Sequence, residues 1–209
     1  RQERLQIATR VKSAILAKWP TADIDVQVFG STVTGESDRV SLSLLLCLHV
    51  LLFPAEIDHG TSDVDLVLLD GMRPFGAGTP YEFCDRESSS ANIRQMPDVP
   101  GAYPEYYNVR KVADALRASG QFLNVQPIKA TVSIVKFRDR ATGIEADINV
   151  NERFGLVNSQ MIKAYCNLRP KLVRPMIYLL KKWAAAKGLN DPSGQTGAMS
   201  FSSYTLALM

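Results

Sequence analysis

The chain contains few of the residues that build disulfide frameworks or zinc sites. It has three cysteines and two histidines in 209 residues, and the cysteines are far apart in sequence, with no Cys-x-x-Cys pair. This scarcity argues against a disulfide scaffold, a zinc site and a histidine-rich metal site. It suits a reducing compartment, and we expect a cytoplasmic location, with the nucleus or the mitochondrion as alternatives.

Extremes of charge and of hydrophobicity are also missing. The net charge is +3, and hydrophobic and charged residues make up 46% and 22% of the chain, as is ordinary for a globular protein. Such a charge permits a polyanionic partner without requiring one. The apolar run at residues 40–54 is shorter than the about 20 residues that cross a bilayer, so no membrane association is predicted.

The same run, residues 40–54, has two interpretations that both stay open. It contains no charged residue and shows neither strand alternation nor a helical stripe, which is consistent with a buried helix. Alternatively it is translated intron, because Val-Ser can be encoded by GTGAGT and Phe-Pro-Ala can contain TTTCCAG, which are typical of splice donors and acceptors. Sequencing the mature transcript decides between the two.

Hydrophobic periodicity predicts an α+β fold. Strands are predicted at residues 24–29, 64–69, 122–128, 131–137 and 144–150. Helices are predicted at residues 1–19, 107–119 and 158–167, and from 200 onward. A further helix is entered at Pro170 to Pro175 and ends at about residue 187. Residues 71–104 and 190–197 are rich in turn residues and are predicted loops. In the first helix we interpret the basic side chains as a solvated face rather than an RNA contact: Arg4, Arg10, Lys12 and Lys18.

Two carboxylates stand at the start of the second predicted strand. Asp63 and Asp65 are two residues apart, so in a strand their side chains point to the same face. Adjacent carboxylates repel unless a cation lies between them, and oxygen ligands favour Mg²⁺ or Mn²⁺. A solvated strand face is the alternative. Asp147 lies on the polar face of the last predicted strand and is a plausible third carboxylate.

Gly30 and Ser31 follow the first predicted strand directly. A glycine at a strand end allows the backbone to approach a ligand closely, and the following serine can offer its hydroxyl and N–H group to a phosphate oxygen. By themselves the two residues indicate only a turn.

Together these segments resemble the DNA polymerase β-like nucleotidyltransferase superfamily, and within it the template-independent poly(A) and poly(U) RNA polymerases, or terminal nucleotidyltransferases. The resemblance extends from Trp19 to Met209 and depends on the order of several short motifs. These are Val28-Phe29-Gly30-Ser31, Thr61-Ser62-Asp63-Val64-Asp65-Leu66, Ala146-Asp147-Ile148, Leu180-Lys181-Lys182-Trp183-Ala184 and Phe201-Ser202-Ser203-Tyr204.

The resemblance implies a role for each matched residue. Asp63, Asp65 and Asp147 would be catalytic and would hold two magnesium ions. The other matched residues would bind the nucleotide: Gly30 and Ser31 around the phosphates, Asn158 at the ribose 2′-hydroxyl, Lys181 and Ser203 at the phosphates, and Tyr204 stacked on the base. Judged without the resemblance, Asn158 is a helix cap, Lys181 a solvated charge and Tyr204 a core aromatic residue.

The resemblance also implies an organisation and an activity. Residues 21–150 would form the catalytic domain, with a mixed sheet flanked by helices. Residues 151–209 would begin a helical domain, incomplete here, with which residues 1–20 would pack. The expected reaction is transfer of AMP or UMP from ATP or UTP to the 3′-hydroxyl of RNA without a template, with a slight preference for ATP. The alternatives are an inactive scaffold that binds nucleotide or RNA, and a nucleotidyltransferase that acts on a small molecule.

Two departures from the family pattern bear on these expectations. The gap between Ser31 and Asp63 is longer than in the family, and residues 40–54 account for roughly the excess, which favours the intron interpretation. Some relatives carry a second lysine one turn after the first, where this chain has Ala185. The phosphate contact is then weaker, or is shared with Lys182 or Lys187.

Overall fold

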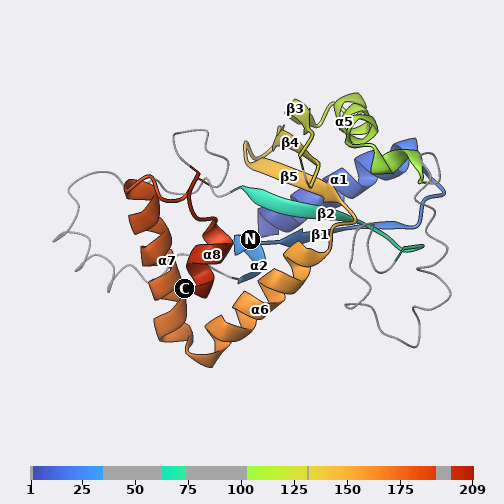
Figure 1. Ribbon diagram of the computed structural model, residues 1–209. Coiled ribbons are helices and arrows are strands. Elements are labelled where there is room, and N and C mark those ends of the chain that lie inside the picture. The colour runs from blue at the N-terminus through green and yellow to red at the C-terminus, as the bar shows by residue number, and fades with distance from the viewer. Residues whose placement is uncertain (1, 35–62, 74–102, 131, 192–198) are drawn as a thin grey trace. The chain divides into compact units, whose positions relative to one another are not determined.

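A computed structural model describes residues 2–34, 63–73, 103–130, 132–191 and 199–209 (Figure 1). These residues form two compact units. The first contains residues 2–29, 63–73, 103–130 and 132–155, and the second contains residues 30–34, 156–191 and 199–209. The run at 40–54 and most of the predicted loops at 71–104 and 190–197 lie outside the described residues, so both interpretations of residues 40–54 remain.

The first unit is built on a five-stranded sheet in the order β1-β2-β5-β4-β3 (Figure 1). Its strands are β1 (Ile24–Phe29), β2 (Val64–Asp70), β3 (Phe122–Ile128), β4 (Ile134–Asp139) and β5 (Glu145–Val150). Strands β2 and β5 are parallel, and the other neighbouring pairs are antiparallel. The predicted α+β fold with a mixed sheet is confirmed. Strand β4 is displaced along the chain from its predicted bounds because Asp139 pairs with Phe122 and extends it.

Helices α1 (Gln2–Lys18) and α5 (Val109–Ala118) pack on this sheet. Helix α1 contacts β1, β2 and α5, and α5 contacts β3 and β4. Their inward side chains are fully buried: Ile7, Val11, Ile15, Val112 and Leu116. We expected residues 1–20 to pack with the helical domain. Helix α1 instead lies in the first unit, because the sheet covers its apolar stripe.

The prediction of a solvated basic face on α1 is wrong at Arg4, which is buried, and at Arg10. The Arg10 guanidinium donates to both carboxylate oxygens of Asp139, over 3.0 and 2.8 Å. Asp139 is fully buried at the end of β4. Burial would raise the pKa of Asp139, but hydrogen bonds from Arg10 and Thr142 outweigh it and lower that pKa. This ion pair fastens α1 to the sheet.

A buried polar network fixes the end of β2. The carboxylate of Asp70, which is fully buried, accepts from Arg73 over 2.8 Å and from the Tyr107 hydroxyl over 3.0 Å. The Asn151 amide donates to the same hydroxyl over 2.8 Å. Residues from three separate segments therefore meet at this end of the parallel pair β2–β5. The carboxylates Asp63 and Asp65 lie at the opposite end of β2, because the strand runs from Val64 to Asp70.

The second unit is helical. It contains α2 (Ser31–Thr34), most of α6 (Phe154–Leu168), α7 (Pro170–Ala186) and α8 (Ser203–Leu208). Its core is Ile162, Cys166 and Ile177, against which Val173, Tyr204 and Ala207 pack. Helix α6 begins at Phe154, four residues before the predicted Asn158, so the assignment of Asn158 as a helix cap is wrong. No helix among the described residues has the length and apolar character needed to cross a membrane.

Candidate functional site

The acidic residues are brought together by strand register. On the parallel pair, Asp65 of β2 stands opposite Asp147 of β5. Asp63 directly precedes β2 and, two residues before Asp65, points to the same face. Asp65 and Asp147 therefore lie on strands, as predicted, whereas Asp63 lies one residue before the start of β2.

The electrostatics of this cluster centre on Asp147. Its side chain is 24% exposed, and its Oδ2 lies 3.4 Å from the Nζ of Lys136 on β4. Burial raises the pKa of Asp147; Lys136 opposes this rise, and the negative charge of Asp63 adds to it. Asp63 is exposed and Asp65 is partly buried. The cluster is thus an excess of negative charge that one lysine partly offsets.

The donor chemistry of the cluster suits a hard divalent cation. Carboxylate oxygens on one sheet face are ligands that Mg²⁺ and Mn²⁺ prefer. In the described part of the chain, no group of three or more His, Cys, Asp or Glu side chains is arranged so that it could hold a metal ion as it stands. Asp147 is turned to Lys136 instead. The residue types therefore suit a divalent metal ion. To bind that ion, the Asp147 carboxylate would have to break its contact with Lys136.

Gly30 and Ser31 belong to the second unit and directly follow β1. Gly30 has a φ of 68°, in the left-handed region that glycine adopts without strain. Its N–H donates over 2.7 Å to the hydroxyl of Ser159, which is buried in α6. Helix α2 begins immediately afterwards at Ser31. Ser159 thus holds the turn that presents Ser31, a role that inspection of the sequence did not reveal.

The other predicted nucleotide contacts also lie in the second unit. Asn158 is partly buried in α6 next to Ser159, and Lys181 is partly buried in α7. Ser203 is the first residue of α8, and its hydroxyl lies 3.3 Å from the side-chain amide of Asn190. Tyr204 packs against the α6–α7 core, as expected of a core aromatic residue. Each unit therefore holds its own part of the predicted residue set.

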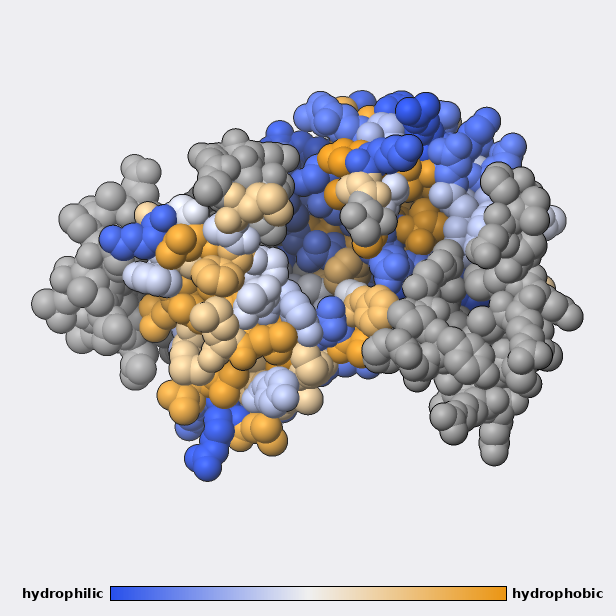
Figure 2. All heavy atoms as spheres, viewed as in Figure 1, coloured by the Kyte–Doolittle hydropathy of each residue, from blue (hydrophilic) through white to orange (hydrophobic). Residues whose placement is uncertain are grey.

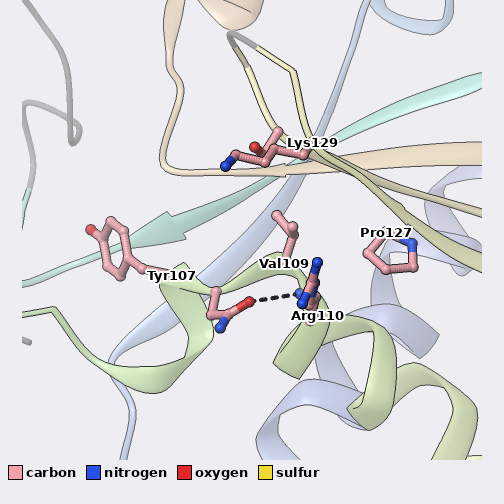
Figure 3. Close-up of a pocket in the computed structure, with 7 residues that line it drawn as sticks. Tyr107, Val109, Arg110, Pro127 and Lys129 are labelled. Carbon is pink, nitrogen blue, oxygen red and sulfur yellow. Dashed lines mark hydrogen bonds between the residues drawn. The ribbon is translucent and has the colours of Figure 1, made fainter. Parts of the chain in front are cut away.

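One pocket in the first unit lies apart from the acids. It has a volume of about 420 Å³, and its lining includes none of the three aspartates: Tyr107, Asn108, Val109, Arg110, Pro127, Lys129 and Ser133. Figure 3 shows Tyr107 and Lys129 at its sides. The Asn108 side chain accepts a hydrogen bond from the Arg110 N–H over 3.0 Å. This hydrogen bond caps the N-terminus of α5, so the Asn108 side chain has a structural role at the pocket.

Comparison with known proteins identifies the family of the chain. The family model described as "Poly(A) RNA polymerase, mitochondrial-like, central palm domain" matches residues 53–167, more than half of the chain. The chain belongs to this family. The matched residues include Asp63, Asp65 and Asp147, so the acids lie within the palm domain.

Two curated proteins are similar to part of this chain. The Poly(A) RNA polymerase GLD2-A of Xenopus laevis is 46% identical over 85 residues, which is 41% of this chain and 16% of that protein. Human Poly(A) RNA polymerase GLD2 is 42% identical over 93 residues, 44% of this chain and 18% of the relative. The chain therefore matches less than a fifth of the length of these relatives.

Two solved structures share the fold. The crystal structure of mtPAP in complex with ATPγS has a TM-score of 0.63 at 22% identity and covers 98% of this chain and 36% of that chain. Terminal uridylyl transferase 4 from Trypanosoma brucei with bound GTP has a TM-score of 0.63 at 20% identity, with coverage of 99% and 50%. These matches extend the shared fold beyond the palm domain into the second unit.

Proposed function

We propose that the protein transfers nucleotides from NTP to the 3′-hydroxyl of RNA without a template. The observation that carries this proposal is the register of Asp65 with Asp147, with Asp63 on the same face, within a palm domain of the poly(A) RNA polymerase family. ATP is the preferred substrate in this proposal and UTP the alternative. The curated relatives of the matched segment are named poly(A) RNA polymerases, which supports ATP.

In the proposed reaction, Asp63, Asp65 and Asp147 hold Mg²⁺ or Mn²⁺. Such a metal ion would lower the pKa of the RNA 3′-hydroxyl and would offset the negative charge of the triphosphate and of the leaving pyrophosphate. Asp147, which is partly buried, also helps to accept the hydroxyl proton. Gly30 and Ser31 hold the phosphates, on a turn fastened by Ser159.

Four further residues complete the proposed nucleotide contacts. Lys181 neutralises phosphate charge, Asn158 contacts the ribose and Ser203 donates to a phosphate oxygen. Tyr204 offers its ring edge or face to the base while the rest of the ring packs on the helical core. The cytoplasm is the proposed location, consistent with the scarcity of cysteine.

The test is an extension assay with the full-length protein, labelled RNA, Mg²⁺ and each NTP separately. Asp63→Ala is expected to lower the extension rate by roughly 100-fold or more, since it removes a charge that acts on the reacting groups. Asp114→Ala is the matched control, because Asp114 is 56% exposed and pairs only with a surface arginine on α5 among the described contacts.

The outcomes separate the proposed activity from its alternatives. Full activity of Asp63→Ala, or absence of RNA extension by the wild-type protein with every NTP, contradicts the proposal. Magnesium-dependent NTP binding without extension would instead indicate a nucleotide-binding scaffold. Transfer to a small acceptor that RNA does not inhibit would indicate a small-molecule nucleotidyltransferase.

A further inference from the structure

A row of side chains crosses the palm sheet from edge to edge on its acidic face. Register places Phe29 of β1 opposite Asp65, Asp65 opposite Asp147, Asp147 opposite Lys136, and Lys136 opposite Gln126 of β3. Residues in register on neighbouring strands share a face. The row therefore has two acids at its centre, an aromatic ring on the β1 side, and a cation followed by an amide on the β3 side.

Lys136 differs from the cations that hold this unit together. Its Nζ lies 3.4 Å from Asp147, and its side chain is 49% exposed. The Arg10–Asp139 pair, in contrast, closes at 2.8 Å on a carboxylate that is 0% exposed. A contact of 3.4 Å between a half-exposed ammonium and a carboxylate that is 24% exposed contributes less to stability than a short, fully buried pair. Stability alone therefore does not account for a lysine next to the acid pair.

The position of Lys136 indicates which substrate it meets. In an in-line transfer, the attacking hydroxyl and the leaving pyrophosphate lie on opposite sides of the phosphorus atom. Strand β1 runs from Phe29 directly into Gly30 and Ser31, the proposed phosphate turn. Lys136 lies on the other side of the acid pair, toward β4 and β3. The acceptor strand of RNA therefore belongs on the side where Lys136 and the exposed Gln126 lie.

We infer that Lys136 is a positioning residue that binds a backbone phosphate of the acceptor RNA next to its 3′-hydroxyl. This inference rests on the proposed function. In the free protein the ammonium neutralises Asp147; with RNA bound it turns to the phosphodiester, as its flexible stem and its exposure allow. A single ammonium on a phosphate positions the strand without reading its sequence.

The inference is tested by RNA binding as well as by turnover. Affinity of the full-length protein for a labelled single-stranded RNA is measured by fluorescence anisotropy, in Mg²⁺ without NTP, over a range of salt concentrations. Lys136→Met is expected to weaken binding roughly tenfold, the scale of one hydrogen bond to a charged group. It should also reduce the slope of log affinity against log salt by about 0.7, the value for one phosphate of a single strand.

Matched variants separate this role from a structural one. Lys136→Arg keeps the charge and is expected to restore the salt slope. Lys12→Met removes a lysine that is 39% exposed and pairs with Asp25 on β1, and its RNA affinity is expected to stay within about twofold, as for surface positions away from the site. In turnover assays, Lys136→Met should raise the KM for RNA but leave the KM for NTP unchanged.

The results also distinguish this inference from the proposed function. If wild-type protein extends RNA and Lys136→Met has unchanged RNA affinity and salt slope, the inference is wrong and the proposed function stands. A rise in the KM for NTP alone would place Lys136 on the donor side and would equally overturn it. If the wild-type protein extends no RNA, but Lys136→Met still binds RNA more weakly and with a smaller dependence on salt, the proposed function fails and the RNA contact stands.

Discussion

At the scale of single residues, Gly155 sets the position of the Phe29 ring. A β-carbon built on Gly155 would lie 2.5 Å from a ring carbon of Phe29, which is closer than side chains tolerate. Phe29 is in register with Asp65 and precedes the Gly30 turn. We therefore expect Gly155→Ala to cost about 1–3 kcal/mol of unfolding free energy, as overpacking does, and to lower RNA extension because the ring must move. Urea denaturation and the extension assay measure the two effects.

Phe29→Leu provides the control for this prediction. The leucine removes ring atoms at the contact, so the double variant Gly155→Ala with Phe29→Leu should be less destabilised than the sum of the two single variants. If the losses of unfolding free energy in the two single variants simply add in the double variant, the contact with Phe29 is not the reason why a glycine is needed at position 155.

Some residues of the acidic site could be predicted from the sequence and others could not. Alternation within a strand placed Asp63 and Asp65 on one face, because that pattern is local. The neighbours Lys136 and Asp147 are joined by pairing between β4 and β5, which a sequence without structure does not specify. Ser159, whose hydroxyl accepts from Gly30, was missed for the same reason, since the two residues are far apart in the chain.

At the scale of secondary-structure elements, strands were predicted better than helix boundaries. Strand β1 was predicted with its observed bounds because Ile24, Val26 and Val28 alternate with polar residues. Helix α6 begins earlier than predicted, at Phe154, since Asn158 and Ser159 are residue types that favour an N-cap but lie inside the helix. Pro175 lies inside α7 although it suggested a helix entry, whereas Pro170 does occupy the first turn, where a missing N–H costs nothing.

The attachment of α1 to the sheet gives a prediction at this scale. Arg10→Met leaves the buried carboxylate of Asp139 without its arginine, which we expect to cost about 3 kcal/mol of unfolding free energy at neutral pH. Lys12→Met on the same helix is the control, because the Lys12–Asp25 pair is half exposed and should cost ~1 kcal/mol or less.

The same pair predicts a pH dependence. The pKa of folded Asp139 is lowered below its usual 3.8, so its contribution to stability is present above the unfolded pKa of about 3.9 and is lost as pH falls through the lower folded value. The stability difference between wild type and Arg10→Met should therefore shrink as pH falls below about 4. Denaturation curves at several pH values test this, and a difference that stays constant down to pH 2 would contradict it.

At the scale of the whole molecule, the helical unit exposes an apolar stripe. Leu172, Met176, Leu179 and Trp183 of α7 are 63%, 56%, 39% and 47% exposed, and their spacing puts them on one helix face. Figure 2 shows hydrophobic side chains over the region of α7. Monomeric proteins seldom leave so much contiguous apolar surface in water, and the matched segment is under a fifth of the length of the curated relatives.

The 209-residue chain produced alone is therefore expected to self-associate. Its mass by light scattering should exceed 23.1 kDa and rise with concentration. Leu172→Lys combined with Met176→Lys should return it to the monomer, because two charges break the stripe while α7 keeps its buried side at Ile177 and Ala184. Met72→Lys, at a residue 76% exposed in the first unit, should leave association unchanged. If the unaltered chain stays monomeric at every concentration, the stripe does not drive association. If Met72→Lys alone also returns the chain to the monomer, net charge rather than the stripe controls association.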